Sequence, residues 1–256
     1  PGHSDYPAYI KYKGFNDVRG GGHFSGRITA PIVFAGSVAK QILKQKGIVI
    51  GAHIQSIKDV YDDSFGVDIS SQDIENMLQQ QYPTLNSHVF EKMQATIEEA
   101  RINCDSVGGM IECAILNVPA GIGNPFFDSI ESHLSPLLFS IPAVKSVSFG
   151  LGEKITELYG HEANDCYYYD DEKVKTKTNH NGGITGGISN GMPIIFRVGI
   201  KPTPSISQVQ QTVNIKTKEN TELEIIGRHD PCIVPRAVVV VESMAALGIL
   251  DMMKDI

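Results

Sequence analysis

The chain has 256 residues, of which 41% are hydrophobic and 20% charged, a composition typical of globular proteins that bury a substantial core. Its formal net charge of −7 argues against nucleic-acid binding as its main role, because such proteins usually carry a basic excess. Its four cysteines lie far apart without a Cys-x-x-Cys spacing, so we expect reduced thiols in the cytoplasm, no disulfide framework and no metal site.

The first predicted elements are a helix followed by a strand. A helix is predicted between Arg27 and Gly47 because four apolar residues recur on one helical face, namely Phe34, Val38, Ile42 and Leu43. The β-branched run at residues 48–54 predicts a strand. A polar helix is predicted at residues 87–103, where Val89, Met93, Ile97 and Ala100 recur at helical spacing, and a strand at residues 109–118.

The second half of the chain is predicted to contain a helix up to Leu138, ended by Pro142, and then a strand at residues 144–149. The tyrosine-rich residues 165–181 lack apolar periodicity and are predicted to form a mobile loop. A strand at residues 193–200 and a buried helix at residues 233–253 follow. Charged residues interrupt this last helix, so we expect no membrane span.

This order of elements lacks the regular strand–helix alternation of a doubly wound sheet, and it favours an α+β architecture with antiparallel sheets. Residues 27–43 and 236–250 each begin with an arginine and continue as an alanine-containing helix. Either an ancient duplication or simply two buried helices would explain this likeness.

Two polar motifs favour binding of anions. The run Arg19-Gly-Gly-Gly-His-Phe-Ser-Gly-Arg27 places three glycines shortly before a predicted helix, where backbone amides, the helix N-terminus and arginines attract phosphate or carboxylate groups. The run Lys201-Pro-Thr-Pro-Ser205 adds a cation and two hydroxyl groups at a strand end, which suits a phosphate-bearing cofactor. A flexible turn and a plain edge turn are the respective alternatives.

The glycine-rich residues 182–191 match neither a dinucleotide-binding fingerprint nor a P-loop, and they are expected to pack against a flat ligand or a neighbouring subunit. Gly227-Arg-His-Asp-Pro-Cys232 places three ionisable residues before an apolar helix, which is costly unless they are paired or functional. A structural cap is the alternative. His3 and Asp5 form a possible histidine–carboxylate pair that would tune a general acid.

Five segments together resemble chorismate synthases in order and spacing. They are Pro1-Gly-His-Ser-Asp-Tyr6, the run from Arg19 to Arg27, Asn181-Gly-Gly-Ile-Thr-Gly-Gly-Ile-Ser-Asn-Gly191, Lys201-Pro-Thr203 and the run from Gly227 to Cys232. Each glycine run alone is weak, whereas five matches in the same order are a specific signal.

The resemblance implies a β-α-β sandwich, with antiparallel sheets and helices packed between them, in a homotetramer. It also implies a carbon–oxygen lyase of the shikimate pathway. In that family, trans-1,4-elimination of phosphate from 5-enolpyruvylshikimate 3-phosphate gives chorismate and requires reduced FMN. The sequence leaves open whether NADPH reduces the flavin within this protein.

The resemblance also implies roles for individual residues. His3 resembles the family histidine that protonates the departing phosphate. Arg27 and Arg228 resemble arginines that bind the substrate. Asp230 resembles an aspartate that helps the flavin accept the substrate proton. Flavin contacts are implied at His23, Phe24 and Ser25, at Pro142 and Ala143, at Gly186, at Lys201, Pro202, Thr203, Pro204 and Ser205, and at Arg228.

Three departures from the family pattern affect these expectations. His23-Phe24 stands where the family commonly has Arg-Ser, and Pro142 where it often has asparagine. Family members also carry a further segment before the Pro-Gly-His motif, so the chain is expected to be one N-terminally incomplete domain over residues 1–256 and to be catalytically impaired by itself. A non-catalytic flavin-binding or assembly module and an anion-binding regulatory domain are the alternatives.

Overall fold

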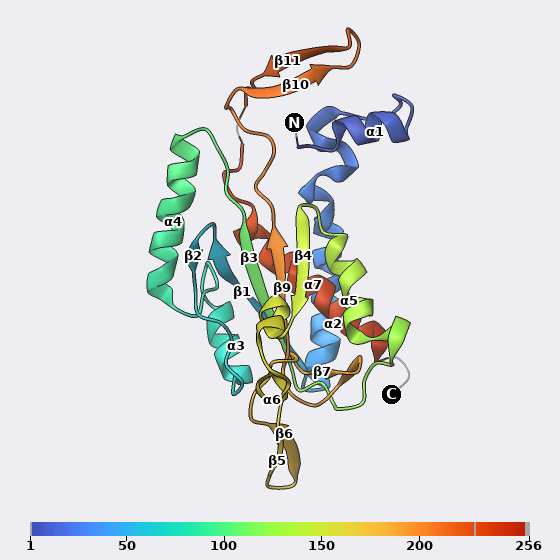
Figure 1. Cartoon of the computed structure of the whole chain (residues 1–256), viewed down its shortest axis with the longest axis vertical. Coiled ribbons are helices and arrows are strands. Elements are labelled where there is room, and N and C mark those ends of the chain that lie inside the picture. The colour runs from blue at the N-terminus through green and yellow to red at the C-terminus, as the bar shows by residue number, and fades with distance from the viewer. Residues whose placement is uncertain (1, 228, 254–256) are drawn as a thin grey trace.

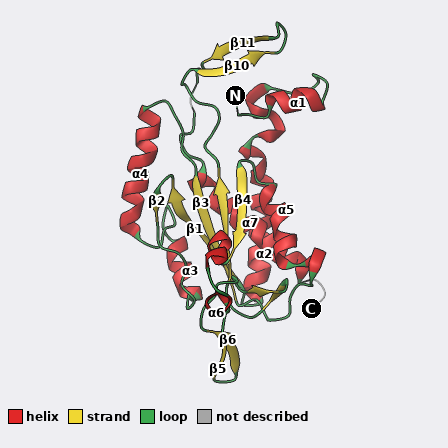
Figure 2. Cartoon of the chain, in the orientation of Figure 1, coloured by secondary structure: helices red, strands yellow, loops and turns green. Residues whose placement is uncertain are grey.

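A five-stranded antiparallel sheet forms the centre of the computed structural model, which describes residues 2–227 and 229–253 (Figures 1 and 2). The strand order is β2 (Val60–Tyr61), β1 (Val49–Ile57), β3 (Gly109–Leu116), β9 (Ile194–Ile200) and β4 (Val144–Phe149). Each neighbouring pair is antiparallel, which confirms the predicted α+β class with antiparallel sheets.

Helices cover both faces of this sheet. One face packs against α2 (Ala30–Gln45), α5 (Ile130–Phe139) and α7 (Val234–Met252), and the other packs against α3 (Ser71–Leu78). Side chains of β3 alternate accordingly, since Ile111 and Cys113 join the core beneath α7 whereas Ala114 joins the smaller cluster beneath α3. The remaining long helix, α4 (Ser87–Ile102), lies beside β2 and β1, and the side chain of Asn86 caps its first turn.

Helices α2 and α7 approach each other closely. A Cβ atom on Gly36 of α2 would lie 2.3 Å from the Cβ of Ser243 on α7, so only glycine fits at this crossing. Next to it, the buried carboxylate of Glu242 pairs with Lys40 and accepts a hydrogen bond from the backbone N–H of Ala52 in β1. One buried side chain therefore connects both helices to the sheet.

Both helices also begin at the same end of the sheet. Helix α2 leads through Gly47 into β1, whose first residue, Val49, pairs with Leu116 at the last position of β3. Helix α2 therefore begins near the opposite end, where β3 begins and β9 ends, which we call the upper end as drawn in Figure 1. Helix α7 begins there as well, because the carbonyl of Pro231 accepts a hydrogen bond from Val107 just before β3.

Short elements extend from both ends of the sheet (Figure 1). A hairpin of β10 (Gln210–Asn214) and β11 (Glu219–Leu223) lies beyond the upper end near α1 (Asp5–Lys11), and one of β5 (Tyr167–Asp170) and β6 (Lys173–Thr176) projects from the lower end. The other short elements are η1 (Arg19–Phe24), η2 (Gly26–Thr29), η3 (Phe126–Asp128), η4 (Gly152–Glu157), α6 (Gly160–Ala163), β7 (Ile184–Thr185) and β8 (Ile188–Ser189).

The structure corrects two sequence-based expectations. Residues 165–181 contain the β5–β6 hairpin, because alternating side chains on two four-residue strands flank a tight turn in which Asp171 has a positive φ. The predicted apolar face of α2 is also wrong in part. Phe34, Val38 and Ile42 are 74%, 45% and 40% exposed, and only Leu43 of the predicted face is buried. Two small residues, Gly36 and Ala39, join it on the face that meets α7. The other predicted helices and strands are confirmed within a few residues.

The α2–α7 crossing gives the first testable prediction. In Gly36→Ala the better helix propensity of alanine favours folding by about 1 kcal/mol. The overpacked crossing costs about 3 kcal/mol, because the new Cβ would also lie 2.5 Å from the backbone Cα of Ser243, so the variant will be net destabilised. Urea unfolding measures this, with Gly66→Ala as the control because nothing lies within 4 Å of a Cβ built there. An equal or higher unfolding midpoint for Gly36→Ala would contradict the close crossing.

Candidate active site

Three consecutive glycines shape a turn at the upper end of the molecule. Gly20, Gly21 and Gly22 in η1 all have positive φ, at 56°, 79° and 53°. A Cβ on Gly22 would approach the carbonyl oxygen of Asp17 to 2.8 Å, so this position requires glycine for space as well as for backbone conformation. Successive backbone N–H groups of a turn can form a concave anion-binding surface in proteins, which makes this turn a candidate anion site.

Two cationic or ionisable side chains lie against this glycine turn. A Cβ built on Gly21 would be 3.3 Å from Nε2 of His3, and one built on Gly20 would be 3.2 Å from an Nη atom of Arg27. The structure therefore brings His3 and Arg27 to adjacent residues of one turn. Nδ1 of His3 lies 3.1 Å from a carboxylate oxygen of Asp5, so the predicted histidine–carboxylate pair is present and Nε2 is the ring nitrogen that faces the turn.

The segment between these two side chains contains three predicted flavin contacts. His23 lies beside Phe24, with ring centroids 4.2 Å apart, and its Nε2 is 3.3 Å from the hydroxyl of Tyr12. The hydroxyl of Ser25 accepts a hydrogen bond from the backbone N–H of Arg27 and caps η2. Aromatic rings and a hydroxyl thus stand next to the glycine turn.

Residues 201–205 connect this region to the sheet. Nζ of Lys201 donates a 2.8 Å hydrogen bond to the carbonyl of Gly2, and its backbone N–H donates to the carbonyl of Ala143 at 3.0 Å. Pro204 lies against Gly2 as well, since a Cβ built on Gly2 would be 3.2 Å from the proline Cβ. The hydroxyl of Thr203 is buried and has no hydrogen-bond partner among the described residues. The structure therefore gathers three predicted binding segments, the His3 loop, residues 142–143 and residues 201–205.

Asp230 lies at the same end of the sheet but has other partners. Its carboxylate is 3.0 Å from an Nη atom of Arg236 in the first turn of α7. Within residues 2–227 and 229–253 it forms no hydrogen bond or ion pair with His3 or Arg27. Nε2 of His229 donates a hydrogen bond to the carbonyl of Ile225 at 3.0 Å, a local backbone contact. Arg228, predicted to bind substrate and flavin, lies outside the described residues.

Gly186 is the one described site residue that the fold does not bring to this region. It lies in the β7–β8 turn, whose neighbour Gly187 accepts a hydrogen bond from Ile130 at the start of α5. This turn is near the lower end of β9, whereas Lys201 follows its upper end, so the seven-residue strand, roughly 20 Å long, separates them. The predicted flavin contact of Gly186 stays a prediction.

The two arginines of the glycine run differ in their partners. Arg19 forms an ion pair with Asp17, and this hydrogen-bonded contact lowers the pKa of the Asp17 carboxyl to about 2. Arg27 forms no ion pair with a carboxylate in the described part of the chain.

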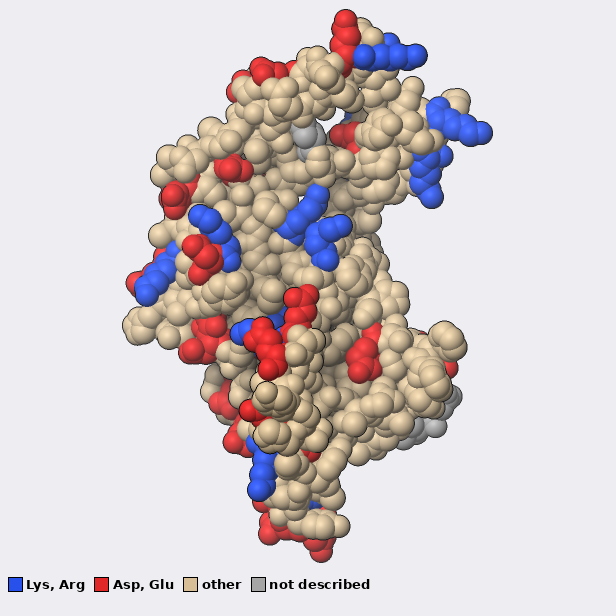
Figure 3. Space-filling model, in the orientation of Figure 1, with Lys and Arg blue, Asp and Glu red and all other residues tan. Residues whose placement is uncertain are grey.

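Basic side chains also gather on the visible face over α1 and the upper end of β4, while acidic side chains dominate the lower half (Figure 3). The upper end is therefore the favourable place for an anionic ligand.

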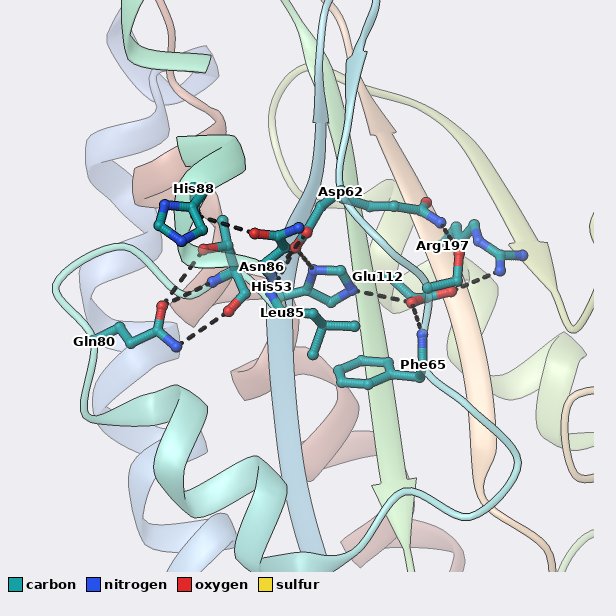
Figure 4. Close-up of polar contacts among 12 residues, drawn as sticks. His53, Asp62, Phe65, Gln80, Leu85, Asn86, His88, Glu112 and Arg197 are labelled. Carbon is teal, nitrogen blue, oxygen red and sulfur yellow. Dashed lines mark hydrogen bonds and ion pairs between the residues drawn. The ribbon is translucent and has the colours of Figure 1, made fainter. Parts of the chain in front are cut away.

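A separate cluster of charges lies on the sheet face covered by α3 (Figure 4). His53 is fully buried, with Nδ1 3.2 Å from Asp62 and Nε2 3.0 Å from Glu112. Arg197 of β9 pairs with the other oxygen of Glu112 at 2.6 Å. Because both acceptors are carboxylates, both ring nitrogens carry protons and His53 is cationic. Two positive and two negative groups therefore balance inside the protein.

Within this cluster the pKa of His53 is raised and the pKa of Asp62 is lowered. Burial opposes the charged form of His53, but its hydrogen bonds to Asp62 and Glu112 outweigh burial and raise its pKa above 6.5. Burial likewise opposes ionisation of Asp62, yet the hydrogen bonds from His53 and from backbone N–H groups, including that of Leu85, lower its pKa below 3.8. The cluster fixes two loops to the sheet and is structural. Within the described residues, no group of acidic, histidine and cysteine side chains could hold a metal ion.

Comparisons with known proteins agree on one family. The profile of the family described as chorismate synthase matches residues 1–254. A chorismate synthase of Pyrococcus abyssi is 49% identical over 252 residues, which cover 98% of this chain and 69% of the relative. One of Methanocaldococcus jannaschii is 44% identical, with 99% and 69% covered. A crystal structure of chorismate synthase superposes with a TM-score of 0.79 at 27% identity, covering 98% of this chain and 70% of that one.

In the described part of the chain, every helix is too short or too polar to cross a membrane.

The contact between Lys201 and Gly2 gives a second prediction. In Lys201→Met the loop that carries His3 loses its hydrogen bond to the ammonium group, so amide exchange in residues 2–11 will become faster by about fivefold, the equivalent of one hydrogen bond. Hydrogen-exchange mass spectrometry measures this. Lys145→Met, at an exposed residue of β4, is the control, and equal exchange in both variants would mean that Lys201 does not hold the loop.

The buried charge cluster gives a third prediction, on stability. His53 stabilises the fold fully below its ordinary pKa of 6.5, and this contribution is lost as pH rises through its raised folded pKa. Asp62 stabilises the fold above 3.8, and this contribution is lost as pH falls through its lowered folded pKa. In Asp62→Asn we expect a loss of about 3 kcal/mol or more at neutral pH and a weaker decline of stability in acid.

Urea unfolding at a series of pH values tests this prediction. Asp170→Asn is the control, because Asp170 pairs with Lys175 on the exposed β5–β6 hairpin and such pairs contribute about 1 kcal/mol or less. Similar small losses in both variants would show that the buried cluster does not stabilise the fold.

Proposed function

The chain belongs to the chorismate synthase family, and from this premise we propose that it binds reduced FMN and 5-enolpyruvylshikimate 3-phosphate and acts as the family's lyase. The proposed reaction is a trans-1,4-elimination of phosphate that gives chorismate in the shikimate pathway. Membership of the family supports the general activity. The convergence of His3 and Arg27 on the glycine turn is the observation in this chain that supports the site.

The chemistry of the substrate suits that convergence. It carries a phosphate and two carboxylates. Arg27 lies against the glycine turn and forms no ion pair with a carboxylate among the described residues, so its guanidinium group is open to an anion. Helix α2 begins three residues beyond Arg27, so the positive end of its dipole faces the same region. We propose that Arg27, together with Arg228, neutralises the bound anion.

The residues at positions 201–205 fit a phosphate-bearing cofactor. The buried hydroxyl of Thr203 lacks a partner in the described structure, and a ligand oxygen would satisfy it. Lys201 supplies a cation next to it, while His23 and Phe24 supply aromatic faces near the glycine turn. When bound, reduced FMN supplies an electron transiently as phosphate departs. Pro142 and Ala143 belong to the same proposed cofactor site, because the carbonyl of Ala143 accepts a hydrogen bond from the backbone N–H of Lys201.

We assign proton transfers to two side chains. Nε2 of His3 donates a proton to the departing phosphate, while Asp5 holds Nδ1 and thereby determines which ring nitrogen faces the turn. Asp230 handles the proton lost from the substrate, and Arg236 positions its carboxylate. His3 and Asp230 are not in contact, which suits two proton transfers at opposite ends of a 1,4-elimination.

We also propose a homotetramer in the cytoplasm. Gly186 lies at the opposite end of the sheet from Lys201, so any contact of Gly186 with the same flavin must come from another subunit. A cofactor shared in this way would make assembly a requirement for tight binding. NADPH is the proposed reductant of the flavin.

Titration with oxidised FMN, with and without the phosphorylated substrate, tests the proposed function. We expect tight binding only when both ligands are present, because the substrate anion and the flavin occupy one site. Arg27→Ala will weaken this substrate-dependent binding by roughly tenfold or more, since a charge-assisted hydrogen bond is lost.

The control variant is Arg101→Ala, because Arg101 pairs with Glu98 on the exposed surface of α4. FMN binding that does not depend on the substrate would instead favour a non-catalytic flavin-binding module. Absence of FMN binding under both conditions would reject the proposed function.

A further inference from the structure

The loop that joins α4 to β3, residues 103–108, contacts both separate parts of the candidate site. The hydroxyl of Ser106 donates a 2.6 Å hydrogen bond to the carbonyl of Thr203, in the predicted cofactor segment. The next residue, Val107, donates its N–H to the carbonyl of Pro231 at 2.8 Å, directly after Asp230. Two consecutive residues of one loop thus hold two segments that share no hydrogen bond or ion pair with each other in the described structure.

Further contacts attach the same loop to the chain beyond residue 205. The carbonyl of Cys104 accepts a hydrogen bond from the N–H of Ser207 at 3.2 Å, and the carbonyl of Asn103 accepts one from the side chain of Gln208 at 2.8 Å. Gly108 closes the loop against β9, because a Cβ there would lie 2.2 Å from the carbonyl oxygen of Ile200. The loop therefore follows the segment after β9 over most of its length.

Hydrogen bonds hold this loop in place, together with the packing of Val107 against the core and of Gly108 against Ile200. A hollow of about 530 Å³ opens behind it, lined by the loop itself, by Lys58 and Glu99, and by Ile200 and Pro202. On the side of the hollow, the loop has no side-chain packing to resist a movement. Loss of one of the hydrogen bonds that join the loop to residues 203–208 and 231 should therefore weaken the others.

We propose that Ser106 is a positioning residue that couples the Lys201–Ser205 segment to the Asp230–Pro231 segment. Its hydroxyl fixes the backbone of Thr203, the residue whose own buried hydroxyl lacks a partner among the described residues. Through Val107 the same loop fixes Pro231 and the adjacent Asp230. The catalytic meaning of this coupling rests on the proposed function, whereas the coupling itself is a property of the fold.

Amide exchange of the ligand-free chain tests the coupling. In Ser106→Ala, we expect exchange of the Val107 and Ser207 amides to become about fivefold faster, measured by nuclear magnetic resonance, because a lost hydrogen bond loosens the whole loop. Ser106→Thr keeps a hydroxyl and will restore slow exchange. Ser37→Ala removes a comparable hydroxyl-to-carbonyl hydrogen bond on α2 and will leave both amides unchanged.

Two results would overturn the proposal. One is unchanged exchange at Val107 in Ser106→Ala, and the other is an equal increase in Ser37→Ala. If Ser106→Ala does not fold, Gln208→Leu decides instead, because it removes the exposed hydrogen bond to Asn103 and should accelerate exchange of the same two amides.

FMN titration connects the coupling to function. Ser106→Ala will weaken substrate-dependent FMN binding about fivefold while Ser106→Thr restores it. If the unaltered chain binds no FMN, the proposed function fails, but the exchange measurement still decides the coupling. If FMN affinity is unchanged although exchange is faster, the loop is a structural link without a role in binding, and the functional part of the inference is wrong.

Discussion

The close crossing of α2 and α7 determines where the candidate site forms. Gly36 allows the two helices to approach until Ser243 fills the space of a side chain, and Glu242 then reaches both Lys40 and the backbone of β1. Since both helices run from the upper end of the sheet, the segments that precede them meet there. Arg27 and Asp230 therefore lie at the same end of the sheet because of a contact in the middle of two helices, not because of any contact of their own.

The buried and the exposed charged groups of this protein differ in whether they have partners of opposite charge. Inside the sheet layer, Glu242 and the cluster around His53 have partners for their charged atoms, so these charges stabilise one arrangement of the strands. At the upper end, Arg27 lacks a carboxylate partner in the described structure and Thr203 has an unpaired hydroxyl. The buried hydroxyl of Thr203 is costly to leave unpaired, and a ligand that pairs with it would recover that cost. The exposed guanidinium of Arg27 is hydrated and free to bind an anion.

Local patterns predicted most of the fold, and long-range contacts explain the rest. The strands at residues 109–116 and 194–200 and helix α7 follow from runs of apolar residues. The buried face of α2 could not be predicted, because a glycine at a helix crossing counts as polar or neutral in any periodicity. For the site, the glycine turn was visible in the sequence. Ser106 and Arg236 were missed, since a serine in a loop and an arginine in a helix carry no distinguishing signal.

The contact of Lys201 with Gly2 joins residues 199 positions apart and suggests how ligand binding and the position of His3 are related. An ammonium group has three donors, and the carbonyl of Gly2 uses one of them. Lys201 can therefore keep its hold on the His3 loop while it binds an anionic ligand with the other two. A ligand bound in this way would restrain the ammonium group of Lys201 without displacing the loop, so binding at residues 201–205 and placement of His3 would support each other.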